Sequence, residues 1–370
     1  LYREYSGATK IEIPANQLVD TSGNTNKATT LDLGQLDRIK PDIVKVSSTV
    51  DKTNKKETIV FDVVDKYLSS TGLGTTVAET KNNLSKLHVY VDDESAENIT
   101  KNITKVEKLT ATIGGQTGQT VGYRYTLELT GFDKTKNSKG YKDWSGTVRL
   151  DVDAGIGKDS SNNTSEATSI KGDFVDFINP YLEYTHQNPD KTNKSYTMAF
   201  NITDKYYTSG KLTLDDLTVK IKNGQLKNGS EIEYNLSELE KAGTVTMSLS
   251  SVELNATTNV KMTNATTGNI ETVASPTIGH AYTLVISNLE KLQIEDGMTT
   301  ADYSGIITVG IKGNVIKDRT SGGSQNGNVG TSITSGIDIP GGTGNGTVVD
   351  VVDPLITGTG TVADPAQGTA

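Results

Sequence analysis

Apolar and polar residues alternate with a period of two in four well-separated stretches of the chain. In each stretch the apolar residues fall on one face of an extended segment: Ile59, Phe61 and Val63; Val148, Leu150 and Val152; Met198, Phe200 and Ile202; Ile307, Val309 and Ile311. This alternation is typical of strands that bury one face. Helical periodicity is rare, and the two best candidates, 101–109 and 234–243, fit either a short helix or a strand with a turn. The pattern therefore predicts an all-β protein.

The chain also repeats itself. The segment "YREYSGATKIEIPANQLVDTSGN" (2–24) matches "YKDWSGTVRLDVDAGIGKDSSNN" (141–163) without a gap, at an offset of 139 residues, and "ADYSGIITVGIKGNVIKDRTSG" (301–322) is a third copy. The same offset of 139 relates "DKTNKKETIVFDVVDKYL" to "DKTNKSYTMAFNITDKYY". Later landmarks drift, because "YTLELTGFDK" and "YTLVISNLEK" lie 157 residues apart. The drift predicts an insertion in the second unit, since loops absorb added residues more readily than packed strands do.

Each repeat holds enough short strands to close around a core of its own. Two sheets packed face to face are the usual way to bury that many strands. Pro41 and Pro180 stand at equivalent places, in "IKP" and "INP". Because proline fixes φ and disfavours helix in the residue before it, we expect a stiff joint just before the first strand of each unit.

Composition narrows the class of protein. A chain of 370 residues, with 34% apolar residues, 6% aromatic residues and 37 glycines, suits two or three β-domains with many turns. The absence of cysteine excludes disulfides and thiolate metal sites. A net charge of −9 argues against nucleic acid as a partner, and no apolar run is long enough for a membrane span. The sequence shows no signal peptide and does not begin with Met, so we expect a mature or partial chain.

The order of these segments resembles the bacterial immunoglobulin-like (Ig-like) tandem repeats of large cell-surface, adhesin-type proteins. The resemblance rests on "YSG" and "DTSGN" closing a unit, and on "DKTN" and "DKY" opening the next, over about residues 1–330. It implies secreted, extracellular Ig-like β-sandwiches in an extended rod. The third copy departs from the pattern, because "DRTSGGSQNGN" lengthens its turn.

The repeat and the resemblance together predict four segments. Residues 1–42 are the closing strands of a preceding or partner-completed Ig-like unit, followed by a joint. Residues 43–179 form one sandwich, and residues 180–330 form a second sandwich with a mid-domain insertion at about 223–279. Residues 331–370 are a Gly/Thr-rich linker or tail with one candidate strand at 347–356.

These features lead to one function and two alternatives. The leading hypothesis is a non-enzymatic structural protein of the bacterial cell surface, a stalk with a role in adhesion. One alternative is a filament subunit, pilus-like or from a virion or phage-tail fibre, assembled by strand exchange. The other is a carbohydrate-binding accessory region of a larger secreted enzyme. The expected partners are other copies of the chain, neighbouring repeats of a longer chain, or an unidentified surface protein or glycan.

Candidate chemistry is sparse. The three histidines, His88, His186 and His280, are far apart in sequence and do not recur at equivalent positions, so we expect no catalytic site. Calcium is the one candidate cofactor. Its weak candidate ligands are Asp20 and Asn24, which occupy the same places as Asp159 and Asn163. Asp65 and Asp204, from the repeated "DKY", would add oxygens only if they approach the same place. The alternative is a turn in which the Asp side chain caps the backbone.

Overall fold

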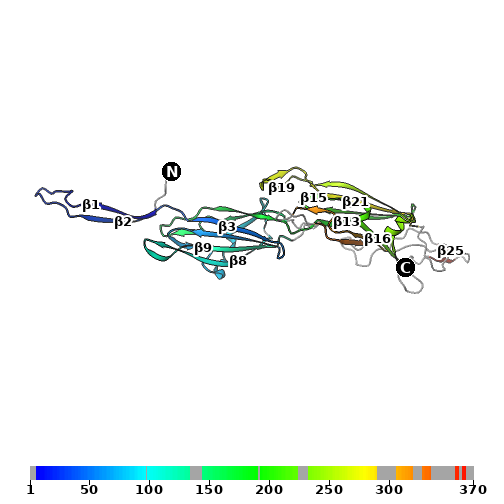
Figure 1. The fold of residues 1–370 in the computed structure, drawn as a ribbon, viewed down its shortest axis with the longest axis horizontal. Helices are drawn as coiled ribbons and strands as arrows, with labels where there is room; N and C mark the ends of the chain where they lie inside the picture. The colour runs from blue at the N-terminus through cyan, green and yellow to red at the C-terminus, as the bar shows by residue number, and fades with distance from the viewer. Residues whose placement is uncertain are drawn as a thin grey trace. The chain divides into compact units, whose positions relative to one another are not determined.

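The described residues fold mostly into antiparallel β-sheets (Figure 1). The structure is a computed structural model, and it describes residues 6–96, 98–133, 144–190, 192–223, 232–289, 306–319, 327–334, 355–357 and 361–363. The described residues fall into two compact units. Unit 1 takes those within Leu1–Asp133, Gly146–Val175 and Thr263–Ile270, and unit 2 takes the remainder.

In the part of the chain that the structure describes, twelve strands lie before Pro180 and fourteen lie after it. The first set is β1 (Ser6–Ile13), β2 (Thr29–Asp37), β3 (Asp42–Asp51), β4 (Lys56–Val64), β5 (Leu68–Thr71), β6 (Leu87–Val91), β7 (Glu94–Ser95), β8 (Thr100–Ile113), β9 (Gln116–Thr130), β10 (Gly146–Val152), β11 (Gly157–Asp159) and β12 (Thr168–Val175). The second set is β13 (Tyr181–Asp190), β14 (Ser195–Thr203), β15 (Tyr207–Ser209), β16 (Leu217–Asn223), β17 (Ile232–Asn235), β18 (Thr246–Asn255), β19 (Val260–Thr263), β20 (Ile270–Val273), β21 (Thr277–Ser287), β22 (Ile306–Ile311), β23 (Lys317–Asp318), β24 (Thr331–Thr334), β25 (Leu355–Thr357) and β26 (Thr361–Ala363).

Unit 1 contains two four-stranded sheets, with strand orders β3-β4-β9-β8 and β12-β10-β6-β7. Along β4 every second residue is buried, and Ile59, Phe61 and Val63 are fully buried, as the alternation predicts. The ring of Phe61 stacks on Tyr125 of β9 at a centroid distance of 5.4 Å. Val148 and its two alternate neighbours on β10 are also buried, so both sheets contribute apolar side chains to the interior.

Unit 2 repeats this arrangement, with sheets β13-β14-β21-β18 and β17-β16-β22-β24. Side chains from β14 and β21 of one sheet and from β16 and β22 of the other form one hydrophobic core. Phe200 stacks on Tyr282 at 5.3 Å, as Phe61 does on Tyr125. The buried side chains of β14 and β22 include all six apolar residues that the alternation predicts there. Each contributes roughly 1.5–3 kcal/mol on burial.

Strand pairing preserves the repeat in detail. The register of β3 on β4 shifts between Lys45 and Ser47, and that of β13 on β14 shifts between Tyr184 and His186, at the same offset of 139 residues. The hairpin of β1 and β2 carries a similar irregularity to the pair β10 and β12. Bulges of this kind aim side chains and end pairing at defined positions. The repeat is therefore structural as well as sequential.

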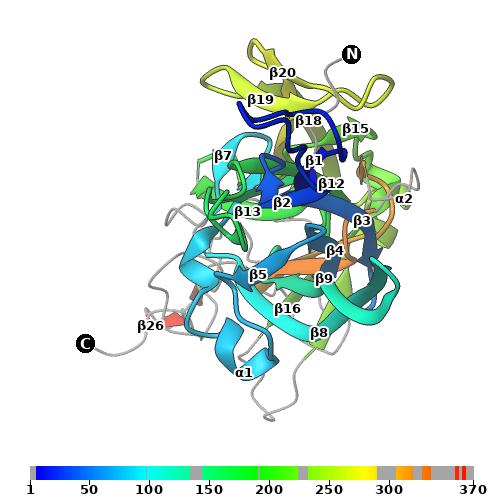
Figure 2. The same ribbon diagram turned by 90° about the vertical axis from the view of Figure 1, so that its left-hand side faces the viewer.

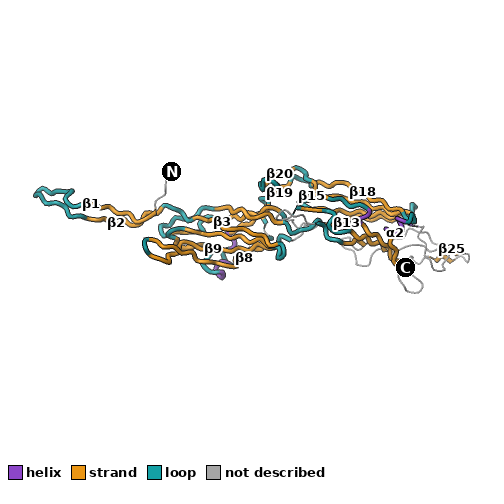
Figure 3. The backbone as a smooth tube through the Cα atoms, in the orientation of Figure 1, coloured by secondary structure: helices purple, strands orange, loops and turns teal. Residues whose placement is uncertain are grey.

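Helices are few and short, as Figure 3 shows for the described chain. They are α1 (Val77–Thr80), which neighbours β8 in Figure 2, α2 (Leu236–Lys241), and single 3₁₀ turns at Leu84–Lys86 and Leu214–Asp216. Of the two candidate helices in the sequence, 234–243 contains α2, whereas 101–109 lies inside β8. Pro41 and Pro180 immediately precede β3 and β13, in agreement with their predicted place before the first strand.

Within the predicted insertion at about 223–279, β18 pairs with β21 as β8 pairs with β9 in unit 1. The helix α2 and the hairpin of β19 and β20 also lie in this range. In the predicted tail, β25 overlaps the end of the candidate strand at 347–356, and residues 347–354 lie outside the described residues. Residues 301–305 and 320–322 of the third copy also lie outside the described residues. The predicted domain boundaries stay predictions.

Candidate metal centres

Three aspartates from separate segments of unit 1 meet in one buried group. Asp37 ends β2, Asp65 follows β4, and Asp159 ends β11. One carboxylate oxygen of each residue lies within 4.8 Å of those of the other two. Each of the three residues is at most 8% exposed. We call this group triad 1.

Unit 2 contains an equivalent group, which we call triad 2. Asp176 lies between β12 and β13, Asp204 follows β14, and Asp318 ends β23. Their carboxylate oxygens also lie within 4.8 Å of one another, and the residues are 2%, 5% and 0% exposed. Each member stands at the same point of the repeat as its counterpart in triad 1. The duplication shows that the group belongs to the plan of the domain.

Local hydrogen bonds hold the middle aspartate of each triad in the same way. The backbone N–H of Tyr67 donates to Asp65 Oδ1 at 2.6 Å, and that of Tyr206 donates to Asp204 Oδ1 at 2.7 Å. This is the turn that the repeated "DKY" encodes, because an Asp side chain readily accepts from the backbone two residues ahead. The turn holds each carboxylate in place through its Oδ1 atom and does not use Oδ2.

The leading aspartates are held by a similar bond. Ile39 N–H donates to Asp37 Oδ1 at 3.1 Å, and Ile178 N–H donates to Asp176 Oδ1 at 3.2 Å. Asp37 Oδ2 is buried and accepts no hydrogen bond from any described residue. A buried acceptor of this kind is rare in folded proteins and calls for an explanation.

The charges in triad 1 repel one another. Burial raises the pKa of the Asp65 carboxyl, and the neighbouring carboxylates of Asp37 and Asp159 raise it further, while the Tyr67 N–H partly offsets these effects. When carboxylates share a buried site, their repulsion favours binding of either a proton or a cation. The donor set, oxygen only, suits a hard cation such as Ca²⁺ or Mg²⁺.

The four weak calcium candidates of the sequence fall in two different settings. Asp159 belongs to triad 1, whereas Asp20 belongs to neither triad. Asn24 and Asn163 each donate their side-chain amide to the Asp four residues earlier, at 2.9 Å and 2.6 Å. The Asp20 and Asp159 carboxylates also accept the backbone N–H of these Asn residues, so both turns are capped as the alternative interpretation expects. Calcium binding by these residues stays a prediction.

Sequence reasoning missed the leading aspartate of each triad, and in triad 2 it also missed Asp318. Asp37 and Asp176 recur at the offset of 139, in "LDRIKP" and "VDFINP", so the repeat itself contains the signal. Nothing local marks these residues as ligands, because each precedes a proline joint in what reads as a connecting segment. Asp65 was expected to contribute only if it approached the turn at Asp159, and the structure brings the two together.

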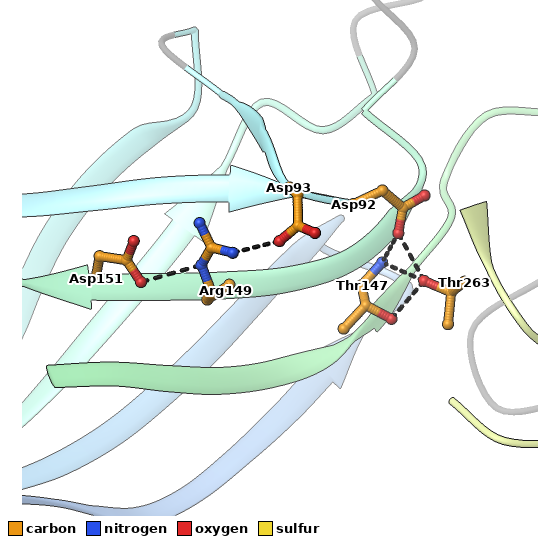
Figure 4. Close-up of polar contacts among 6 residues, drawn as sticks. All are labelled: Asp92, Asp93, Thr147, Arg149, Asp151 and Thr263. Atoms are coloured by element: carbon orange, nitrogen blue, oxygen red, sulfur yellow. Dashed lines mark hydrogen bonds and ion pairs between the residues drawn. The ribbon is translucent and has the colours of Figure 1, made fainter. Parts of the chain in front are cut away.

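A second polar cluster in unit 1 surrounds Arg149 of β10 (Figure 4). Its guanidinium forms ion pairs with Asp93 and, at 3.0 Å, with Asp151. The ring of Tyr90 lies 4.3 Å from the guanidinium carbon, a cation–π distance. With a carboxylate on either side and a ring beneath, the charge of Arg149 is neutralised within the sheet.

The buried carboxylate of Asp92 lies beside this cluster (Figure 4). Its Oδ1 accepts from Thr147 N–H at 2.8 Å and from the Thr263 hydroxyl at 2.6 Å. A Cβ on Gly146 would lie 2.5 Å from the Asp92 carboxyl carbon. This contact explains the glycine of the "SG" dipeptide at this position, because no side chain fits there.

Unit 1 also buries a glutamate. Glu57 of β4 is 0% exposed and accepts from Ser48 Oγ at 2.8 Å and from Asp173 N–H at 2.6 Å. Burial raises its pKa to about 7, against the lowering effect of those two hydrogen bonds. Glu57 is separate from the triads in sequence and belongs to a different network.

The histidines stand on three different strands. His88 of β6 places Nε2 3.2 Å from Asp153 Oδ1, and His280 of β21 meets the ring of Tyr207 edge-on at 5.6 Å. Burial lowers the pKa of His280. His186 lies on β13.

Comparisons with known proteins found no match that would indicate a function. No protein-family model matches the chain, and the curated proteins include no matching sequence. Among the described residues, no helix combines the length and the apolar character that crossing a membrane requires.

Proposed function

We propose that the chain is a non-enzymatic, extracellular structural or adhesive protein made of tandem Ig-like β-sandwiches. The observation that supports this most strongly is the repetition of one domain plan, down to the hydrogen bonds of the two "DKY" turns. Repeating a domain in tandem adds length and surface to a chain, which is what a stalk or an adhesin requires. The resemblance to bacterial surface repeats points the same way.

The strand order supports the Ig-like interpretation. If β3, β4, β6, β8, β9, β10 and β12 are taken as strands A, B, C, D, E, F and G, the sheets of unit 1 read A-B-E-D and G-F-C, with β7 added beside C. This is the arrangement of immunoglobulin domains. Unit 2 gives the same order with its own strands, and its two sheets share one core.

Surface exposure on intact source cells tests the extracellular role. Antibodies raised against the purified chain should label intact cells, and brief protease treatment of those cells should remove the label. A cytoplasmic protein serves as the control for lysis, because its signal should survive the same treatment. Labelling that requires broken cells would contradict the proposal.

One observation bears on the filament alternative, in which strand exchange joins copies of the chain. The hairpin of β1 and β2 corresponds to β10 and β12, yet its apolar residues are exposed. Ile11 is 47% exposed and Leu31 is 46% exposed, whereas the equivalent Leu150 and Ile170 are 0% and 2% exposed. A sheet of the same kind, from a neighbouring repeat or another copy, would cover this face.

Sedimentation of the purified chain over a range of concentrations distinguishes the two sources of that sheet. Strand exchange between copies predicts large, concentration-dependent assemblies that Thr9→Pro on β1 reduces, because proline removes a backbone donor from a strand edge. A monomer at all concentrations would instead support coverage by a neighbouring repeat and would contradict the filament.

A further inference from the structure

We propose that each triad is a calcium site, so that the described chain binds two Ca²⁺ ions. Triad 1 supplies Asp37, Asp65 and Asp159, and triad 2 supplies its three equivalents. The assignment rests on the geometry of the carboxylates and holds whether or not the protein is a surface stalk.

The spacing of the oxygens fits one shared ion. Calcium binds oxygen ligands at about 2.3–2.6 Å, so two ligands on opposite sides of the ion lie roughly 5 Å apart. In both triads the three carboxylate oxygens lie within 4.8 Å of one another, which is inside that limit. One ion can therefore contact all three residues without a change of backbone.

The buried state of Asp37 points to a ligand independently of the spacing. This residue is 8% exposed, and its Oδ1 accepts the Ile39 N–H while Oδ2 accepts no hydrogen bond from a described residue. Two further carboxylates, of Asp65 and Asp159, lie close by and carry no proton donors when ionised. A cation at this place would be a partner for Asp37 Oδ2 and would offset the charge of its two neighbours.

Burial and ligand type favour Ca²⁺ over other divalent ions. Mg²⁺ gives up its waters reluctantly and usually keeps several, which suits an open site better than residues at most 8% exposed. Zn²⁺ prefers nitrogen and sulfur ligands, and neither triad includes a histidine or cysteine. Calcium accepts six to eight oxygens in flexible geometry, and each triad supplies one carboxylate oxygen from each of three residues.

Each site joins segments that are distant in the chain. In unit 1 the ion would connect Asp37, at the end of β2, to the turns that follow β4 and β11. Asn163 already donates to the carbonyl oxygen of Asp37 at 3.1 Å, so this segment lies against the turn at Asp159. Calcium would therefore stabilise the unit by fixing the segment that leads into it.

Isothermal titration of the EDTA-treated full chain with CaCl₂ tests the proposal. We expect two ions per wild-type chain, one for Asp159→Asn, one for Asp318→Asn, and none for the double variant. The matched control is Asp20→Asn, which changes the equivalent residue of a turn with the same hydrogen bonds but outside both triads, and it should still bind two ions.

Thermal unfolding gives a second readout on the same samples. At about 100 times the dissociation constant, Ca²⁺ should raise the wild-type Tm by roughly 5–10 °C, and this rise should be absent in the double variant. If Asp159→Asn does not fold in EDTA, Asp65→Asn replaces it. Absence of binding up to roughly 10 mM CaCl₂, beyond the range of extracellular calcium modules, would overturn the site. Equal binding of MgCl₂, or loss of an ion in Asp20→Asn, would overturn the assignment.

Discussion

Glu57 should make the stability of unit 1 depend on pH between about 4.5 and 7. Its folded pKa is about 7, above the 4.5 of an ordinary glutamate, so the folded protein holds the proton more tightly than the unfolded chain. Relative to a neutral side chain, Glu57 has little effect below pH 4.5 and becomes steadily more destabilising as pH rises from 4.5 to about 7, above which its effect is constant. The difference in pKa corresponds to about 3 kcal/mol at high pH.

The variant Glu57→Gln isolates this effect. Gln keeps an oxygen that can accept from Ser48 and from the Asp173 N–H, but it cannot ionise. The unfolding free energy of the variant minus that of the wild type should therefore rise by about 3 kcal/mol between pH 4.5 and pH 8. Most of this rise should fall between pH 5 and 7. Both triads are unchanged in this variant, so their titration cancels in the comparison.

Urea unfolding followed by circular dichroism at a series of pH values measures the difference, at one fixed calcium concentration. Hydrogen exchange of β4 peptides assigns the transition to unit 1. Unit 2 provides an internal reference, because Tyr196 stands at the equivalent position and donates to Gln187 Oε1 at 3.0 Å. The exposed Glu12→Gln on β1 is the matched control and should follow the wild type. Parallel pH curves for Glu57→Gln and wild type would refute the reasoning.

Three further predictions concern the interiors of the two units. Phe61→Ala should destabilise unit 1, and Phe200→Ala should destabilise unit 2, each by about 3–5 kcal/mol in urea unfolding, because both rings are fully buried. If either variant shifted the unfolding transition of the other unit, the division into two units would be contradicted. Gly279→Ala should lower the unfolding free energy of unit 2 by more than about 2 kcal/mol, since its φ is +140° and a Cβ would lie 2.0 Å from a carbonyl oxygen. The control Gly115→Ala, at positive φ but in open space, should lower the unfolding free energy of unit 1 by about 1 kcal/mol. Asn328→Ala should lower the unfolding free energy of unit 2 by about 3 kcal/mol, because the side-chain oxygen accepts hydrogen bonds from two backbone N–H groups at 2.9 Å. An unchanged urea midpoint would contradict that role.

Local patterns determined much of the fold. The buried faces of β4, β10, β14 and β22 follow from alternation along single strands, because successive side chains of a strand point to opposite sides. The turn "DKTN" is also local. Asn54 donates its side-chain amide to Asp51 at 2.7 Å, and Asn193 does the same to Asp190 at 2.7 Å. Such contacts depend on residues three positions apart, which the sequence shows directly.

Local sequence did not decide between helix and strand where both were plausible. The segment 101–109 is strand because β8 pairs along its length with β9, and β9 in turn pairs with β4. The segment 236–241 forms α2, where Asn235 caps the first turn by accepting from Ser237 N–H. Pairing with a distant strand is a tertiary property, so alternation alone cannot predict it.

The triads show what only the tertiary structure decided. The sequence contains Asp37, Asp65 and Asp159, and it shows an aspartate at each equivalent position of unit 2. It gives no sign that they meet, because they belong to three segments whose distance depends on how the sheets of the unit close. Their burial, the buried oxygen of Asp37 and the raised pKa of Asp65 all arise from that closure. A repeat identifies equivalent residues, but only the folded chain brings three carboxylates close enough to form the proposed calcium site.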